Sequence, residues 1–248
     1  MNLRSVTINL LLTTLSGGIL MQTLEAQAAS ITFGAWNFQP ATVTTNSSFA
    51  TGQGNATPMT LKAVAEATAT ANPLSWAKKS ARTVVSLSNV FTVTAETGEK
   101  NGDKVKGVLS GRLEGVLGAS VEDGSAPGFY ASLVGASVNA GFASWTSALS
   151  PVFGNDLGSV ATIVNQPINE EGILTIGEQY QFNMSLEVTA LTTGYAQALS
   201  NFSGDGQGFT VNIQTESTPE PLTMLASATA LGFGAFFKRQ HSKNQKKS

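Results

Sequence analysis

Cysteine is absent from this 248-residue chain, and histidine occurs once, as His241. Without cysteine, disulfide frameworks, thiolate metal sites and thiol nucleophiles are excluded. Because the single histidine lies close to the C-terminus, the rest of the chain cannot supply a Ser-His-Asp arrangement or a metal site built on imidazole. The G-x-S-x-G, H-E-x-x-H and phosphate-binding Gly-rich motifs are also missing. We therefore expect no catalytic residues, no metal and no cofactor, and a protein that is not an enzyme.

Charged residues make up only 12% of the chain, and they are unevenly divided. Residues 29–112 hold eight lysines and arginines against four acids, whereas residues 113–218 hold ten acids and no lysine or arginine. One interpretation is a functional field, with an acidic face for cations and a basic face for anionic glycans. The other, which we favour, is that strands from both halves interleave in one domain, so that the charges mix on its surface. The excess of acids in this body disfavours nucleic acid as a partner.

The N-terminus has the layout of a secretory signal peptide over residues 1–28. Arg4 gives a positive start, residues 6–21 are largely apolar, and Ala26 and Ala28 form an A-x-A cleavage site. Cleavage after Ala28 is our first choice and cleavage after Ala29 the second. The segment predicts passage through the secretory translocon.

The C-terminus has three parts that act on a membrane. Pro219, Glu220 and Pro221 form an extended, exposed triplet, because each proline fixes φ and disfavours helix before it. Residues 222–237 carry no charge, and as a helix they fall just short of a comfortable transmembrane length. Lys238 and Arg239 begin a basic tail that holds the end of the chain on the cytoplasmic side. We expect a marginal anchor suited to temporary retention in the inner membrane.

These residues together resemble the PEP-CTERM sorting signal of bacterial exported proteins, in wording most similar to its cyanobacterial members. The resemblance is carried by the Pro-Glu-Pro triplet, the small residues of the apolar run and the basic tail. It implies handling by an exosortase, a membrane enzyme that cuts at the triplet and releases the protein or transfers it to the cell surface. The alternative is an ordinary C-terminal membrane helix that follows a chance triplet. On this basis the chain divides into residues 1–28, a body at 29–215, and the sorting signal at 216–248, with the triplet at 219–221, the helix at 222–237 and the tail at 238–248.

The body predicts an all-β fold. Alternation of apolar and polar residues is strongest over 82–94, 180–190 and 209–213. Weaker candidate strands lie at 31–38, 105–117, 130–139, 159–164 and 194–202. Many strands with Gly-rich turns favour an antiparallel β-sandwich, of which a jelly roll is one form. The stretch from residue 175 to the triplet also resembles the last three strands of PEP-CTERM proteins.

Two local patterns predict other structure. Leu61, Val64 and Thr68 share a helical face, which predicts a short helix within 58–71. Asn101-Gly102 lies between two strand-like runs, which predicts a tight hairpin.

Few side chains suggest chemistry. Glu178 and Glu187 could form a glycosidase pair, but they lie nine residues apart and therefore on opposite faces of a strand. Asp205, or Asn155 with Asp156, could hold calcium, although turn formation is the default for such residues. Candidates for stacking on sugar rings are the three tryptophans, although core packing is favoured for each: Trp36, Trp76 and Trp145.

We expect an exported, exosortase-processed protein of the cell surface or extracellular matrix, associated with exopolysaccharide or biofilm and without catalytic activity. Its partners would be the translocon, the exosortase, the membrane while the anchor is in place, and extracellular polysaccharide. Two alternatives remain open. One is a carbohydrate-binding module that recognises particular glycans. The other is a glycan-active hydrolase that uses paired carboxylates.

Overall fold

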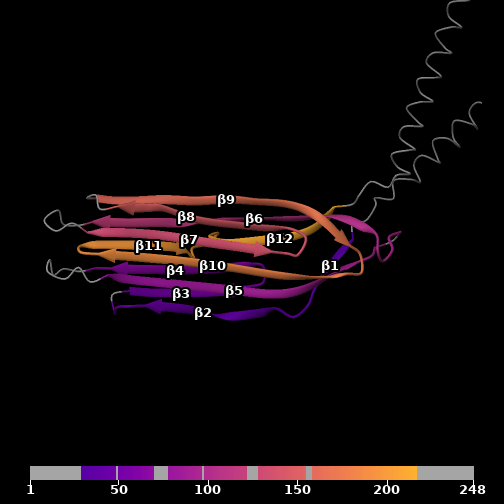
Figure 1. The fold of residues 1–248 in the computed structure, drawn as a ribbon, viewed down its shortest axis with the longest axis horizontal. Helices are drawn as coiled ribbons and strands as arrows, with labels where there is room; N and C mark the ends of the chain where they lie inside the picture. Colours follow the sequence, from indigo (N-terminus) through magenta and orange to yellow (C-terminus); the bar gives the residue numbers. More distant parts are fainter. Residues whose placement is uncertain are drawn as a thin grey trace, which may run out of the picture. The chain divides into compact units, whose positions relative to one another are not determined.

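The computed structural model describes residues 29–48, 50–69, 78–96, 98–121, 128–154 and 158–216, which belong to one unit, Ala29–Glu216. The described residues are built from antiparallel strands, with no helix among them (Figure 1). Accordingly, no described helix is long and apolar enough to cross a membrane. The expected signal peptide with its cleavage site at Ala26 and Ala28, the triplet Pro219–Pro221, the apolar run and the tail that begins at Lys238 lie outside the described residues.

Twelve strands are described. Their bounds are β1 Ser30–Phe33, β2 Asn37–Thr45, β3 Ala50–Thr57, β4 Thr60–Thr68, β5 Lys79–Thr94, β6 Lys104–Val121, β7 Phe129–Asn139, β8 Ser144–Gly154, β9 Gly158–Thr175, β10 Gln179–Thr193, β11 Ala196–Phe202 and β12 Gly208–Glu216. The three strongest sequence predictions correspond to β5, β10 and β12, and the weaker candidates fall within or overlap β1, β2, β6, β7, β9 and β11.

The strands form two sheets that face each other as a sandwich. Sheet A has the order β5-β10-β7-β8, with β1 and β2 both paired to the free side of β5. Sheet B has the order β3-β4-β6-β9, with β11 and β12 sharing the position between β4 and β6. Figure 1 shows β2 and β3 together at one side of the sandwich and β8 and β9 at the other. The all-β, antiparallel prediction is confirmed.

Pairing in the central strands is nested. β7 pairs with β8, β6 with β9, β5 with β10 and β4 with β11, all antiparallel. Strands β4–β7 therefore pair, in reverse order, with strands β8–β11, as in one long hairpin. Each pair brings together residues that are farther apart in the sequence than those of the pair inside it. Such long-range pairing is costly in loop-closure entropy and is typical of slowly folding β proteins.

The core follows the alternation of the strands. In β10, Phe182, Met184 and Leu186 are buried while the residues between them face outward. β5 presents Leu87 and Phe91 to the same core. Because successive side chains of a strand point to opposite faces, each sheet buries one face and leaves the other in solvent.

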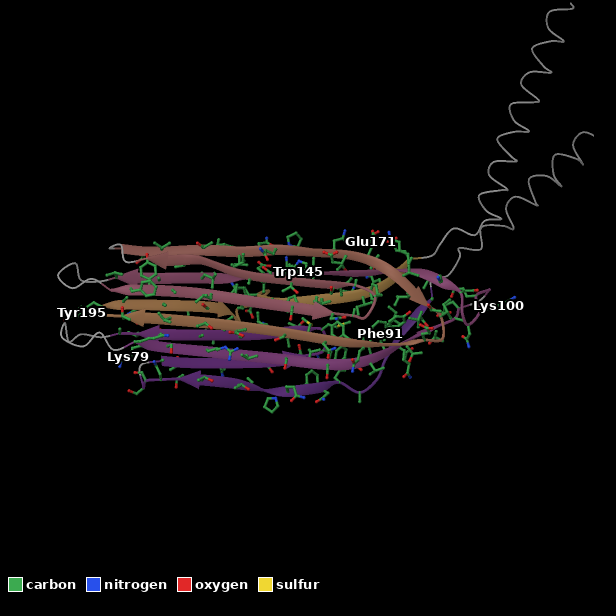
Figure 2. All side chains as sticks on the ribbon, in the orientation of Figure 1. Lys79, Phe91, Lys100, Trp145, Glu171 and Tyr195 are labelled. Atoms are coloured by element: carbon green, nitrogen blue, oxygen red, sulfur yellow. The ribbon has the colours of Figure 1, made fainter. Side chains whose placement is uncertain are left out.

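The core changes in residue size along the strands. At one end, the facing positions of β4, β5, β10 and β11 are mostly alanine. Away from that end they are larger, and β5, β10 and β11 each contribute a buried phenylalanine. Phe91 stacks on Tyr180, with ring centroids 5.4 Å apart, and meets Phe142 edge-on at 6.4 Å. Figure 2 shows Phe91 toward the end of the strands near Lys100, and Tyr195 and Lys79 at the opposite end.

The alanine-rich end allows direct hydrogen bonds between the two sheets. Three fully buried hydroxyls each donate to a backbone carbonyl of the opposite sheet. The bonds are Thr83 Oγ1 to Val64 O at 2.8 Å, Ser132 Oγ to Gly118 O at 2.7 Å and Ser200 Oγ to Thr189 O at 2.8 Å. Such bonds remove the cost of burying a polar hydroxyl and hold the sheets in one relative position.

The three prolines in the described strands all lie in strands at the edges of the sheets. Pro40 in β2 falls where the pairing register shifts between Gln39 and Thr42. Pro151 in β8 falls at the corresponding shift opposite β7. Pro167 lies in β9, whose pairing to β6 continues without a shift. Proline cannot donate to a ladder, so it is tolerated at edges and bulges and also discourages further pairing there.

Two local predictions are wrong. Residues 60–68 form strand β4 instead of a helix, because Leu61, Ala63 and Ala65 alternate into the core between two partner strands. Asn101-Gly102 forms a turn, but the strands it joins lie in different sheets. The N–H of Gly102 instead donates to Ile176 O at 2.9 Å, which ties the turn to the β9–β10 connection.

Both sheets contain strands from the lysine- and arginine-rich half (residues 29–112) and from the acidic half (residues 113–218). Each described ion pair joins a cation from residues 29–112 to an acid from residues 113–218. The pairs are Arg82–Glu187 at 2.6 Å, Lys106–Glu171 at 2.8 Å, Lys106–Glu216 at 2.9 Å and Arg112–Glu114 at 3.1 Å. The favoured interpretation, in which the charges mix on one surface, therefore agrees with the described residues.

Candidate functional site

The outer face of sheet A carries two rows of uncharged polar side chains, which we call the polar rows. Strand pairing aligns them across β2, β5, β10, β7 and β8. The first row is Asn37, Ser88, Asn183, Asn139 and Ser144, and the second is Gln39, Ser86, Ser185, Ser137 and Thr146. Neighbouring strands lie about 4.8 Å apart, so each row is a regular array of hydrogen-bonding groups.

The polar rows face solvent because the residues between them fill the core. Leu87, Met184 and Val138 are all buried, and each lies between a member of the first row and a member of the second. Alternation then directs the polar neighbours outward. The same residues that hold the sandwich together therefore fix the positions of the polar rows.

The polar rows line an open hollow of about 560 Å³. Nine of their ten members contribute to it, and Asn37 is the one that does not. The described residues that line it include no charged side chain and no aromatic ring. The hollow therefore offers a long, shallow and neutral surface instead of a deep pocket.

Most of these side chains have no partner among the described residues. Within the rows, Gln39 Nε2 donates to Asn37 Oδ1 at 3.1 Å, and Asn139 Oδ1 accepts from the N–H of Gly141 at 2.8 Å. The other seven make no hydrogen bond with any described side chain or backbone group. Each hydroxyl can both donate and accept, and each amide presents two donors and an acceptor. The face thus keeps its hydrogen-bonding capacity for a ligand or for water.

Farther along the same face, one ion pair is self-neutralising. The guanidinium of Arg82 donates two hydrogen bonds to the Glu187 carboxylate, from Nε to Oε1 at 2.6 Å and from Nη2 to Oε2 at 2.7 Å. These hydrogen bonds and the charge of Arg82 lower the pKa of the Glu187 carboxyl, and the carboxylate raises the pKa of Arg82. Because the two charges cancel at close range, the pair leaves the polar rows electrically neutral.

A smaller hollow on the outer face of sheet B has a basic lining. Its volume is about 470 Å³, and Lys62 and Arg112 are its charged residues. Both are already engaged, since Lys62 Nζ donates to Ser203 O at 3.5 Å and to Gly204 O at 3.0 Å, while Arg112 pairs with Glu114. This hollow is less suited to a ligand than the polar rows.

The calcium candidate Asp205 lies in the turn between β11 and β12. The backbone carbonyls that such a site would use accept hydrogen bonds from Lys62. Among the described residues no three acidic or histidine side chains gather as a metal site would require. The other candidate, Asn155 with Asp156, lies outside the described residues.

The tryptophans considered for sugar stacking do not lie on the polar rows. Trp36 is half-buried, with Phe33 and Phe38 stacked near it at 5.1 and 6.4 Å between ring centroids. Trp145 points inward from β8 and packs on Phe209, with ring centroids 5.6 Å apart; Figure 2 labels it about midway along the strands. Trp76 lies outside the described residues.

The carboxylates Glu178 and Glu187 do not share a cleft. Glu187 faces outward beside Arg82, whereas Glu178 precedes β10 and lies 3.5 Å from the Tyr180 hydroxyl. No carboxylate is among the described residues that line either hollow. An acid catalyst needs a raised pKa, and the pKa of Glu187 is shifted the other way.

The sequence alone does not predict the polar rows. The polar halves of β5 and β10 are visible as Ser86, Ser88, Asn183 and Ser185 in the alternating pattern. Their alignment with β2, β7 and β8 depends on pairings between residues far apart in the chain, which local pattern does not reveal.

No protein-family model matches the chain, and no curated protein matches its sequence. The solved structure of TmCBM61 in complex with beta-1,4-galactotriose is 10% identical, over 72% of this chain and 90% of that one, with a TM-score of 0.24. A structure of infectious bursal disease virus, Gt strain, is 13% identical over 68% of this chain and 47% of that one, with a TM-score of 0.13. At TM-scores this low, neither likeness carries weight for fold or function.

Proposed function

We propose that this chain is an exported protein of the cell surface or extracellular matrix that associates with neutral polysaccharide through the polar rows, without cleaving it. The polar rows carry this proposal. They form an uncharged, regularly spaced and largely unpartnered set of donors and acceptors, which suits a ligand rich in hydroxyl groups. A glycan chain lying across the strands would meet a new hydroxyl or amide at every strand.

The two ends of the chain support the export half of the proposal. The apolar leader with Ala26 and Ala28 predicts translocation. The triplet at Pro219 resembles the PEP-CTERM signal, which implies exosortase processing and release from a transient inner-membrane anchor. A protein delivered in this way would have access to extracellular polysaccharide.

We further infer that the sandwich is a jelly roll. The nested pairs, from β7–β8 outward to β4–β11, place four strands in each sheet in the order expected when one long hairpin is wound around a core. β1, β2, β3 and β12 then extend this framework. Sandwiches of this kind serve many binding functions, so the topology itself does not choose the ligand.

The binding half is tested by affinity electrophoresis of the full chain in mild detergent, through gels that contain a neutral glucan or an anionic alginate. We expect the neutral glucan to retard the protein. The Ser137→Ala/Ser185→Ala variant removes two central hydroxyls with little change of volume, and should lose most of the retardation. The matched control is Ser110→Ala/Asn212→Ala, a paired position on the outer face of sheet B, which should migrate as the parent does.

Two results would contradict the binding proposal. One is that the neutral glucan does not retard the protein. The other is that the sheet B control loses as much retardation as the Ser137→Ala/Ser185→Ala variant. The hydrolase alternative predicts new reducing ends when the protein is incubated with the same glucans, and we expect none. Retention with release of fragments would favour that alternative over simple binding.

The export half is tested by the intact mass of the protein in cells with and without the exosortase. We expect a mature form that lacks residues 1–28. It should end near Pro219 only in the cells that contain the exosortase. A mature protein that still carries Lys246 and Lys247 would contradict processing at the triplet, and would leave the binding proposal to stand or fall separately.

A further inference from the structure

Strand β9 is the least protected edge of the sandwich. It has 18 residues, pairs on one side with β6 along its whole length, and has no described strand on its other side. The opposite edge of sheet B, β3, has eight residues, and the edges of sheet A are broken by register shifts at Pro40 and Pro151. A long free edge is a template for pairing with another strand.

The two halves of β9 differ in chemistry. Residues 158–166, GSVATIVNQ, carry no charge and are rich in β-branched residues, whereas Glu170 and Glu171 follow Pro167. Ile163 is 78% exposed, the highest value among the exposed large hydrophobic residues of the described chain. Val160, also in this half, is 44% exposed. Only the first half therefore combines a free edge with apolar surface and no charge.

Pro167 indicates where the free backbone groups of this half point. It pairs with Arg112 of β6, and because proline has no N–H, this pair must be one that exchanges no hydrogen bonds. Such pairs recur at every second residue, so Ile163 opposite Val116 is another. The N–H and C=O groups of Ser159, Ala161, Ile163 and Asn165 therefore point away from β6, toward the open edge.

We propose that two copies of this chain associate through antiparallel pairing of β9 with β9, about a two-fold axis at Ile163. This arrangement places Ile163 beside the partner's Ile163 and Ala161 beside the partner's Asn165. The free backbone groups of Ala161, Ile163 and Asn165 in the two strands then satisfy each other, and the exposed isoleucines cover each other. Sheet B becomes continuous across the dimer.

Charge selects this arrangement over the parallel one. The antiparallel overlap runs from residue 159 to 167 and leaves Glu170 and Glu171 of both copies outside it. A parallel pairing would set the same glutamates side by side, which is unfavourable for like charges. Pro167 ends the usable ladder at the boundary, because it has no N–H to offer.

A second β9 is also a better occupant than β3 of another copy. The outward side chains of β3 are Thr51, Gln53, Asn55 and Thr57, all polar. Pairing with β3 would leave Ile163 beside polar groups, and would extend head to tail without closing. The two-fold contact closes and buries the apolar surface of both copies.

The test uses cross-linking of single-cysteine variants, which is clean because the chain has no cysteine. Directly opposed residues of such a pair have Cα atoms about 5.5 Å apart, within disulfide range. Full-length Ile163→Cys in mild detergent should become a reducible dimer on mild oxidation. Gln53→Cys on β3 and Ile173→Cys, which is exposed on β9 outside the overlap, should remain mostly monomeric.

A dimer yield for Ile163→Cys no higher than for Gln53→Cys would overturn the proposal. A mixture of the two variants that gives mainly mixed dimers would overturn it in favour of head-to-tail assembly.

Sedimentation of cysteine-free chains gives an independent check. Ile163→Lys places two like charges opposite each other and should weaken dimerisation by about tenfold or more. Val90→Lys adds the same charge at an exposed hydrophobic residue on sheet A, so this control should dimerise as the parent does. Equal association of the two variants, or a parent that is monomeric at every concentration, would contradict the proposal.

Discussion

Removal of the three hydroxyls that join the sheets should destabilise the sandwich measurably. The substitutions are Thr83→Val, Ser132→Ala and Ser200→Ala, and each leaves the side-chain volume nearly unchanged. Each hydroxyl is fully buried and donates at 2.7 to 2.8 Å to a carbonyl of the opposite sheet. A buried neutral hydrogen bond contributes about 1 kcal/mol to the free energy of unfolding.

The triple variant should therefore lose about 2 to 3 kcal/mol, less than strict addition where neighbouring sites couple. For a domain of this size the melting temperature should fall by about 5 to 10 °C. Urea denaturation of the full chain, followed by tryptophan fluorescence and circular dichroism, measures the loss. Ser185→Ala, an outward serine without a described partner, is the control and should change the free energy by less than about 0.5 kcal/mol. A triple variant as stable as this control would refute the idea that the hydroxyls hold the sheets together.

Three further outcomes follow from the described contacts. A double-mutant cycle on Arg82 and Glu187 should give a coupling of about 0.5 kcal/mol that shrinks in high salt, because both side chains are substantially exposed. The fold lowers the pKa of Glu187 from its ordinary 4.5. The contribution of the pair to the free energy of unfolding should therefore be present above pH 4.5 and be lost as the pH falls through the lower folded-state pKa. Measuring the free energy of unfolding against pH should show this acid loss in the parent and not in Glu187→Gln. Gly115→Ala should lower the free energy of unfolding by about 1 to 3 kcal/mol, because its Cβ would lie 2.3 Å from a ring carbon of Phe202. The control is Gly135→Ala, which should be neutral or slightly stabilising because a Cβ there would have nothing within 4 Å. Equal melting temperatures of the two variants would contradict the packing around Gly115.

The central strands could be predicted from the sequence because they alternate strongly. In β10, Phe182, Met184 and Leu186 alternate with polar residues, and each is buried as that pattern requires. β3 and most of β2 could not be predicted, because these edge strands contain few large apolar residues. Gly52 and Gly54 of β3 show why: a Cβ at either would clash with Thr83 or Val85, so the strand depends on close approach instead of on side-chain burial.

Small residues also explain the wrong helix within 58–71. Alanine favours helices in isolation, and the alternation Leu61, Ala63, Ala65 is weak when its apolar members are small. Burial between two partner strands overrides that local preference in β4. The polar rows could not be predicted because they depend on contacts between residues far apart in the chain. Ser137, for example, lies beside Ser185 only because β7 pairs with β10.

Binding of neutral polysaccharide to the polar rows can be measured by nuclear magnetic resonance of the isotope-labelled full chain titrated with a neutral oligosaccharide. Binding at this face should shift the backbone amides of Ser86, Ser137 and Ser185 together and saturate with a single dissociation constant. The amides of Ser110 and Asn212, on the outer face of sheet B, should stay in place. Shifts confined to sheet B, or no shift at any oligosaccharide concentration, would show that the polar rows do not bind neutral polysaccharide.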